Sequence, residues 1–187
     1  MAGAMLNAVT PLPAASVIVL RDAEPALSGV EGLEVLLLRR NAKSSFVPNA
    51  WVFPGGIVER QDASIRDAAA RETFEEAGVR VDPEALVPTS RWITPAGIPK
   101  RFDTWFFLAE VARDVTVTID DGEIVESMWI APADALARRD LHLVFPTIKN
   151  LEALTGFASV AELIESRRGA VIDPIEPVLV EGRPVMP

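Results

Sequence analysis

Short apolar stretches separated by polar loops run along most of the chain, and they predict a series of strands. Ala14–Leu20 is apolar and β-branched, and Leu33–Arg40 (LEVLLLRR) is almost continuously apolar, as expected of a central strand. The other strands that we predict are Ala50–Phe53, Leu86–Ile93, Phe102–Val111 and Ile124–Ile130. The intervening loops, which contain proline or glycine, are Asp22–Gly32, Asn41–Asn49, Pro54–Gly56 and Thr94–Lys100.

One longer segment, Ser64–Ala77, has the pattern of a helix. It opens with S-x-x-D, which is close to a capping box, and Gly78 stands where a glycine commonly ends a helix. Ala70, Phe74 and Ala77 share one face, so we expect this helix to be buried between layers with only its acidic patch open. Shorter helices are predicted at Pro132–Arg138, Val144–Leu154 and Val160–Arg167.

The length of 187 residues fits a single domain with modest additions. We expect a core from about residue 14 to residue 154, followed by a C-terminal helix and a proline-rich tail over residues 155–187. The tail from Asp173 is expected to lie extended on the surface or to fray. Alternating strands and helices indicate an α/β class.

Charge and composition restrict the partners. The formal net charge of −9 disfavours a nucleic-acid polymer, whereas a small phosphorylated molecule remains compatible if cations neutralise it locally. There is no cysteine, no apolar run near the ~20 residues that span a bilayer, and no basic start typical of a signal peptide. These features lead us to expect a cytoplasmic protein without a membrane partner. A homodimer is one option that the sequence leaves open.

The strongest chemical signal is a group of acids on the predicted helix. Glu72, Glu75 and Glu76 are spaced i, i+3 and i+4, so they converge on one face and repel one another unless a cation lies among them. Carboxylate oxygens suit Mg²⁺ or Mn²⁺. An acidic surface helix without function is the competing interpretation, but the apolar residues on the other faces and the upstream F-P-G-G disfavour it.

The residues around these acids form a recognisable motif. Phe53–Gly56 followed by residues 71–79 (RETFEEAGV) resembles the signature of the Nudix family, G-x5-E-x7-R-E-U-x-E-E-x-G-U, where U is a large aliphatic residue. Thr73 departs from that pattern. Asp62 replaces the first glutamate, and Arg71 follows it by nine positions instead of eight. Because of this insertion, we expect Asp62 to lie off-register and to matter much less than the helix glutamates.

The resemblance implies a Nudix α/β/α sandwich, in which a mixed sheet carries a central catalytic loop–helix–loop. It further implies a metal-dependent hydrolase that cleaves the diphosphate linkage of a nucleoside diphosphate derivative. The glutamates Glu72, Glu75 and Glu76 would hold the metal, and Gly55 and Gly56 let the backbone approach it closely. Arg71 could hold one glutamate in place.

Several residues outside the helix are further candidates. Glu123, in the loop after Asp120-Asp121-Gly122, could be a metal ligand or the base that deprotonates water, with Glu126 as its competitor. Arg101 and Arg39 could contact substrate phosphate, although a surface role is equally compatible, and Arg40 shares this ambiguity with Arg39. The only histidine, His142, is expected to be structural or exposed and not catalytic.

Further stretches point to one branch of the family. V-L-L-L-R-R, R-F-D-T-W-F-F-L and E-S-M-W-I-A-P resemble the branch that contains the eukaryotic peroxisomal coenzyme A diphosphatases. Coenzyme A or acyl-coenzyme A is therefore the substrate that we expect first. The segment before Phe53 lacks the basic, glycine-containing element of the best-known coenzyme A-cleaving group, so ADP-ribose-like nucleotide sugars and oxidised nucleotides remain alternatives. A catalytically silent nucleotide sensor and a structural interaction domain are the non-enzymatic alternatives.

Overall fold

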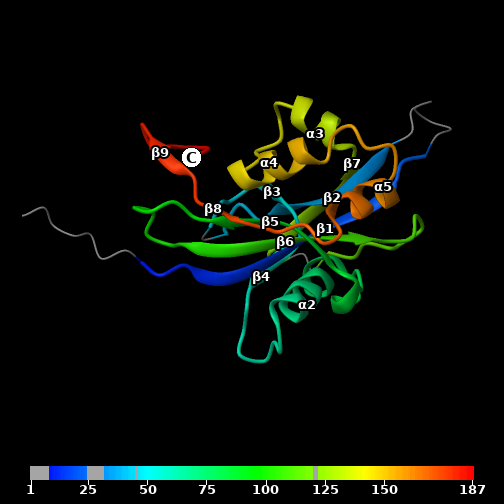
Figure 1. The fold of residues 1–187 in the computed structure, drawn as a ribbon, viewed down its shortest axis with the longest axis horizontal. Coiled ribbons are helices and arrows are strands. Elements are labelled where there is room, and N and C mark those ends of the chain that lie inside the picture. The colour runs from blue at the N-terminus through cyan, green and yellow to red at the C-terminus, as the bar shows by residue number, and fades with distance from the viewer. Residues whose placement is uncertain (1–8, 25–31, 45, 120–121) are drawn as a thin grey trace, which may run out of the picture.

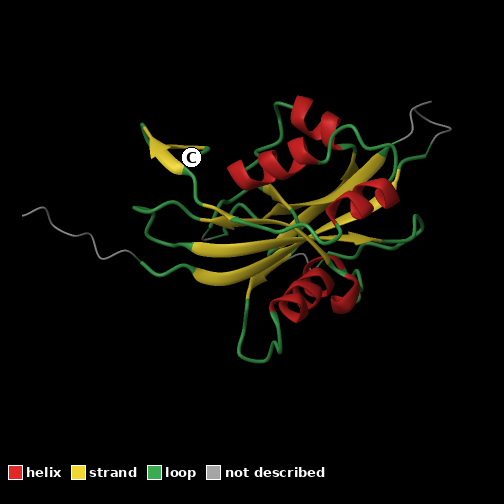
Figure 2. Ribbon diagram, viewed as in Figure 1, coloured by secondary structure: helices red, strands yellow, loops and turns green. Residues whose placement is uncertain are grey.

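The computed structural model of the chain describes residues 9–24, 32–44, 46–119 and 122–187. Figure 1 shows a central sheet with helices on both sides, and Figure 2 separates the helices in red from the strands in yellow. The sheet strands are β1 (Leu12–Asp22), β2 (Leu33–Arg40), β3 (Trp51–Val52), β4 (Gly55–Ile57), β5 (Val87–Ile93), β6 (Phe102–Glu110), β7 (Ile124–Ile130) and β8 (Pro174–Ile175). The helices are α2 (Ile65–Ala77), the 3₁₀ turn η1 (Pro83–Ala85), α3 (Pro132–Ala137), α4 (Phe145–Ala153) and α5 (Val160–Arg167).

The sheet is mixed, as the sequence predicts for this fold class. Its strand order is β3-β2-β1-β6-β5-β8, with β4 paired to β1 and β7 paired to β2. The central β1–β6 pair is parallel, whereas β1–β2, β1–β4, β2–β7 and β5–β6 are antiparallel. The strand β2 lies inside the sheet, and its apolar residues from Val35 to Leu38 are buried. The expected α/β sandwich is therefore confirmed.

Each face of the sheet has its own apolar core. On one face, the small residues Ala68, Ala69 and Ala77 of α2 pack against β1, β2 and β6. On the other face, α3, α4 and α5 cover the aromatic side chains Trp51, Phe53 and Trp92. Figure 1 shows α2 below the sheet and α3 and α4 above it. The alternating orientation of residues along β1 and β2 supplies both cores at once.

The helix α2 begins and ends where the sequence predicts. The Ser64 side chain accepts a hydrogen bond from the Asp67 N–H, and Gly78 adopts the left-handed conformation (φ 68°) that ends the helix. The expectation that α2 is buried on all but its acidic side is wrong. Phe74 is 42% exposed and lies beneath the Arg80 guanidinium, because α2 packs on the sheet with one face only. The buried Thr73 instead points to the sheet and donates to the Ala69 carbonyl.

One other segment differs from expectation, and the C-terminal tail lies extended on the surface as expected. The glycine pair after Pro54 was expected to break regular structure, but it begins β4, which pairs with β1. The C-terminal tail adds β8 to the sheet edge beside β5 and then forms a separate hairpin of β9 (Val178–Val180) and β10 (Arg183–Val185). Backbone hydrogen bonds available on the β5 edge explain why this proline-rich segment is ordered.

Candidate active site

The site is built where β4 passes beneath α2. The Ser16 hydroxyl of β1 donates to the Pro54 carbonyl (2.8 Å), which fixes the start of β4. A Cβ atom on Gly55 would lie 2.4 Å from the Ala15 carbonyl oxygen. A Cβ atom on Gly56 would lie 2.5 Å from the Glu72 carboxylate. Both glycines are therefore required by close contacts, one with the neighbouring strand and one with the acidic helix face.

Glu76 is the most deeply placed acid of the site. Glu76 is only 6% exposed, and its Oε2 accepts a hydrogen bond from the Gly55 N–H (2.9 Å). Burial raises the pKa of Glu76 to about 8, and the negative charges of Glu72 and Glu123 act in the same direction. Glu76 therefore holds a proton near neutral pH unless a cation replaces it.

Two further carboxylates share this electrostatic environment. Burial also raises the pKa of Glu72, and Glu75 and Glu123 add to the rise. Glu123 lies in the loop before β7, where it forms an ion pair with Arg40. Asp120 and Asp121, from the same loop, lie outside the described residues. The geometry thus brings Glu72 and Glu76 of α2 toward Glu123, which comes from a distant part of the sequence.

Arg71 organises the outer side of the acidic group. Its Nε and Nη2 donate to the two carboxylate oxygens of Asp62 (2.9 and 3.0 Å), and its Nη1 donates to Glu72 (2.8 Å) and Glu75 (2.9 Å). The hydrogen bond from Arg71 lowers the pKa of Asp62, and the same contact raises the pKa of Arg71. The expected grip of Arg71 on a glutamate is present.

The expectation that Asp62 lies off-register is wrong. Its side chain is 3% exposed and holds Arg71 through both oxygens, which is a favourable geometry for a carboxylate–guanidinium pair. The turn of residues 59–62 absorbs the inserted residue, since the Glu59 N–H donates to the Asp62 carboxylate and the Asp62 N–H to the Glu59 carbonyl. The shorter aspartate therefore reaches the arginine despite the longer spacing.

Among the described residues, no three acidic or histidine side chains already form a closed metal-binding cluster. Arg71 holds Glu72 and Glu75, and the Gly55 N–H holds Glu76. The donor set nevertheless fits a hard divalent cation, because carboxylates with raised pKa values gain most from a nearby positive charge. Binding would require a small rotation of Glu72 away from Arg71.

The two arginines at the end of β2 point to opposite faces. Arg39 follows Leu37 toward the α3 and α4 side, where it forms an ion pair with Glu126 (2.9 Å). The geometry therefore gives no support to the substrate contact expected of Arg39, nor to Glu126 as a site acid. Arg40 instead faces α2, and its charge acts on Glu76. Strand alternation relative to the buried leucines is the signal that separates the two arginines.

Arg101 joins separate segments of the chain. Its buried guanidinium donates to the Thr94 carbonyl (2.9 Å) and the Val9 carbonyl (3.0 Å), and it forms an ion pair with Glu176. These contacts join the chain before β1, the loop before β6 and the C-terminal tail. The substrate contact expected of Arg101 is not supported, because its donors are already engaged within the protein.

The sequence profile of the NUDIX domain family matches residues 10–150, and the chain therefore belongs to the Nudix family. It is 26% identical, over 70% of this chain, to the acyl-coenzyme A diphosphatase NUDT19 of Xenopus laevis. It is 30% identical, over 55% of this chain, to the m7GpppN-mRNA hydrolase NUDT17 of Bos taurus. The expected resemblance to the coenzyme A diphosphatase branch is thus confirmed.

A crystal structure of a NUDIX hydrolase from Alicyclobacillus acidocaldarius has the same fold, with a TM-score of 0.73 at 23% identity over 83% of this chain and 96% of that one. The chain spans 62% of the length of the Xenopus laevis relative and 38% of the Bos taurus relative. In the part of the chain that the structure describes, no helix is long and apolar enough to cross a membrane.

The two glycines give a matched pair of variants. Gly55→Ala should destabilise the fold by about 2 kcal/mol, because the new methyl group meets backbone atoms of β1 that have no room to move. Gly56→Ala should preserve most of the stability, because its methyl group meets only the flexible end of Glu72, yet it should abolish activity by displacing that carboxylate. Urea unfolding and hydrolysis rates measure the two effects. Full activity in Gly56→Ala would contradict the described position of Glu72.

The Asp62–Arg71 pair predicts a positioning effect. Asp62→Asn should reduce kcat by about tenfold or more with little change in KM, as for other residues that orient metal ligands. Asp62→Glu should retain more activity, since a carboxylate can still pair with Arg71. The losses from Asp62→Asn and Arg71→Lys should be non-additive in the double variant. Additive losses would mean that the two residues act separately.

The raised pKa of Glu76 predicts how the metal-free protein responds to pH. The folded protein holds this proton up to about pH 8, whereas the unfolded chain releases it near the ordinary value of 4.5. Because the folded state binds more protons across that window, stability should fall as the pH rises from about 4.5 to about 8. Thermal midpoints in chelator should fall more steeply for the natural sequence than for Glu76→Gln. Parallel pH profiles would refute the assignment.

Proposed function

We propose that the chain is a metal-dependent hydrolase that cleaves the diphosphate linkage of a small nucleoside diphosphate derivative. One observation carries this proposal: the buried Glu76 and the half-buried Glu72 lie beside the glycine turn of β4 and share their electrostatic environment with Glu123. An acidic group with raised pKa values in a net acidic protein suits a divalent cation and an anionic substrate more than it suits a plain surface.

The residues divide into metal-holding and positioning roles. Glu72, Glu75 and Glu76 would hold Mg²⁺ or Mn²⁺ beside the backbone of Gly55, and such an ion neutralises the diphosphate and makes a bound water easier to deprotonate. One of these three glutamates, or Glu123, would accept the proton of the attacking water. Arg71, held by Asp62, orients Glu72 and Glu75. The glycines of β4 leave room for a phosphate oxygen.

Coenzyme A or acyl-coenzyme A is the substrate that we propose first. The similarity to an acyl-coenzyme A diphosphatase supports this choice. The similarity to an m7GpppN-mRNA hydrolase supports a nucleoside diphosphate linkage too, but the net charge of −9 disfavours a polyanionic RNA chain. ADP-ribose and other nucleotide sugars remain the alternative substrates, and a silent nucleotide sensor is the alternative without catalysis.

A turnover screen tests the proposal. Protein stripped with chelator should be inactive and should regain activity with Mg²⁺ or Mn²⁺. Coenzyme A, dephospho-coenzyme A, ADP-ribose and NADH should then be compared by kcat/KM, with coenzyme A expected to exceed dephospho-coenzyme A by about tenfold or less, equivalent to about 1.4 kcal/mol.

The loss of kcat in each variant should follow the burial of the acid that is replaced. Glu76→Gln and Glu72→Gln should each reduce kcat by orders of magnitude, whereas the exposed Glu75 should matter less. Full activity in chelator would refute the metal mechanism. If none of the four compounds is hydrolysed with either metal, the silent sensor becomes the better explanation.

A further inference from the structure

A lysine and two aromatic rings meet at the end of the sheet where β6 begins. Phe46, from the loop before β3, and Phe102, the first residue of β6, lie edge to face with ring centroids 5.1 Å apart. The Lys100 ammonium lies 5.3 Å from the Phe102 ring and 5.9 Å from the Phe46 ring. We call these three residues the Lys100 corner. Both rings are half-buried, and the lysine is exposed.

Strand register connects this corner to the acidic site. Gly55 of β4 and Phe106 of β6 both pair with Ser16 of β1, so these three residues form one row across the sheet. Glu76 is hydrogen-bonded to Gly55 at one end of this row. Phe102 lies four residues earlier on β6, on the same face as Phe106, which is the face covered by α3, α4 and α5. Along the strand the two residues are about 13 Å apart at the usual rise. That separation is comparable to the length of an extended nucleotide.

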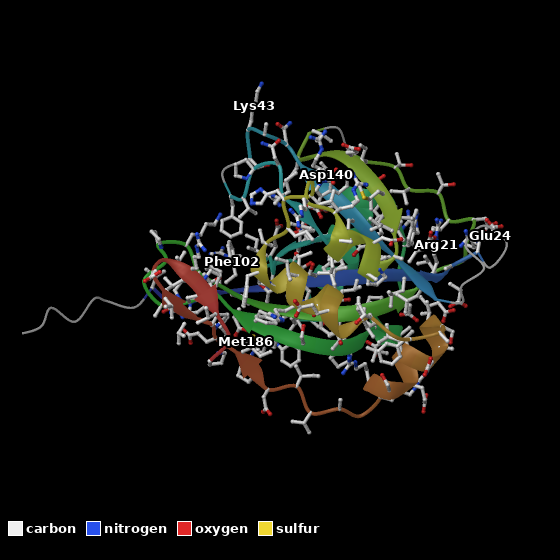
Figure 3. The ribbon with its side chains drawn as sticks, turned by 90° about the horizontal axis from the view of Figure 1, so that it is seen from above. Arg21, Glu24, Lys43, Phe102, Asp140 and Met186 are labelled. Atoms are coloured by element: carbon white, nitrogen blue, oxygen red, sulfur yellow. The ribbon has the colours of Figure 1, made fainter. Side chains whose placement is uncertain are left out.

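Two apolar side chains near this row are exposed. Ile57 of β4 is 42% exposed and lies in the row of Thr104, between the rows of Phe106 and Phe102, and Leu12 of β1, which is 47% exposed, lies in the row of Phe102. A ribose or a planar base could contact both. In Figure 3, Phe102 and Met186 lie at one end of the molecule, opposite Arg21 and Glu24.

A single arginine joins the corner to the acids. Arg40 donates from Nε to the Phe46 carbonyl (3.2 Å), and its Nη2 pairs with the Glu123 carboxylate. Glu123 in turn acts on both Glu72 and Glu76. The side chain of Arg40 therefore connects the loop that carries Phe46 to Glu123 of the acidic group. The buried Arg101 anchors the other side, where its contacts with Val9 and Glu176 hold the chain next to Phe102.

The Lys100 corner has the chemistry to hold the base end of a nucleotide. Aromatic rings stack on the faces of nucleobases, and an ammonium on a flexible stem can turn from the rings to a phosphate. Within the described residues, the recorded partners of the Lys100 ammonium are rings and not a carboxylate. In a chain with a net charge of −9, this leaves Lys100 available to an anion.

We propose that Phe46 and Phe102 bind the nucleobase of the substrate and that Lys100 binds a phosphate on its ribose. This inference rests on the proposed function, since it names the part of the substrate that lies beyond the diphosphate. The positive charge for this phosphate then comes from Lys100, which follows α2 in the sequence, whereas the segment before Phe53 lacks a basic cluster. One exposed lysine also fits the modest discrimination that we expect between coenzyme A and dephospho-coenzyme A.

Calorimetric titration in metal-free buffer tests this site without requiring turnover. The probes are AMP, 3′,5′-ADP and ribose 5-phosphate, and the proteins are the natural sequence, Phe46→Ala and Lys100→Ala. Phe46→Ala should weaken AMP about tenfold and leave ribose 5-phosphate unchanged, because only AMP has a base to stack. Lys100→Ala should remove the preference for 3′,5′-ADP over AMP.

Lys149→Ala is the matched control. Lys149 also lies over a ring, that of Phe145 at 5.7 Å, but it is on α4 and forms an ion pair with Glu152 (2.7 Å). Its loss changes the net charge equally and should leave all three affinities unchanged. The proposal is overturned if the natural sequence does not bind AMP, or if Phe46→Ala weakens AMP and ribose 5-phosphate equally or not at all. Hydrolysis with unaltered AMP binding in Phe46→Ala would refute this site and leave the proposed function intact.

Discussion

The hydrogen bond from the Gly55 N–H to the buried Glu76 carboxylate is the contact on which the rest of the site depends. It fixes α2 against β4, and it sets the distance between Glu72 and Gly56. Burying a carboxylate is unfavourable unless it is hydrogen-bonded, protonated or paired with a cation. The fold therefore keeps an acid in a place where a hydrophobic residue would be more stable, and this cost is understandable if the acid serves the chemistry.

Two arginines form ion pairs with the acids around that contact, but neither of them pairs with Glu76 itself. Arg71 holds Asp62, Glu72 and Glu75 on the outer side, and Arg40 holds Glu123 on the opposite side. Glu76 itself has no arginine partner in the described part of the chain, and its pKa is the one most strongly raised among these acids. The arrangement orients the outer acids through ion pairs, whereas the inner acid has no such partner among the described residues.

Much of this site could be predicted from the sequence, because its central part is local. The helix spacing alone brings Glu72, Glu75 and Glu76 together, and Ser64 and Gly78 mark the helix ends. Non-local features were missed. The turn that lets Asp62 reach Arg71 depends on loop conformation, and the exposure of Phe74 depends on how one helix face meets the sheet. The choice between Arg39 and Arg40 depended on strand alternation, which the sequence does contain.

The parallel pairing of β1 with β6 has a consequence for how the protein is made. These strands, aligned from Leu12 with Phe102 to Leu20 with Glu110, are separated by the whole segment that contains β4 and α2. A connection of such high contact order closes slowly, because a long loop must be ordered before its contacts form. The helix that carries the glutamates therefore has no complete sheet to dock on until β6 has left the ribosome. The acidic site is therefore expected to assemble late in synthesis, and the helix with its glycine turn is not expected to form it when grafted alone into another protein.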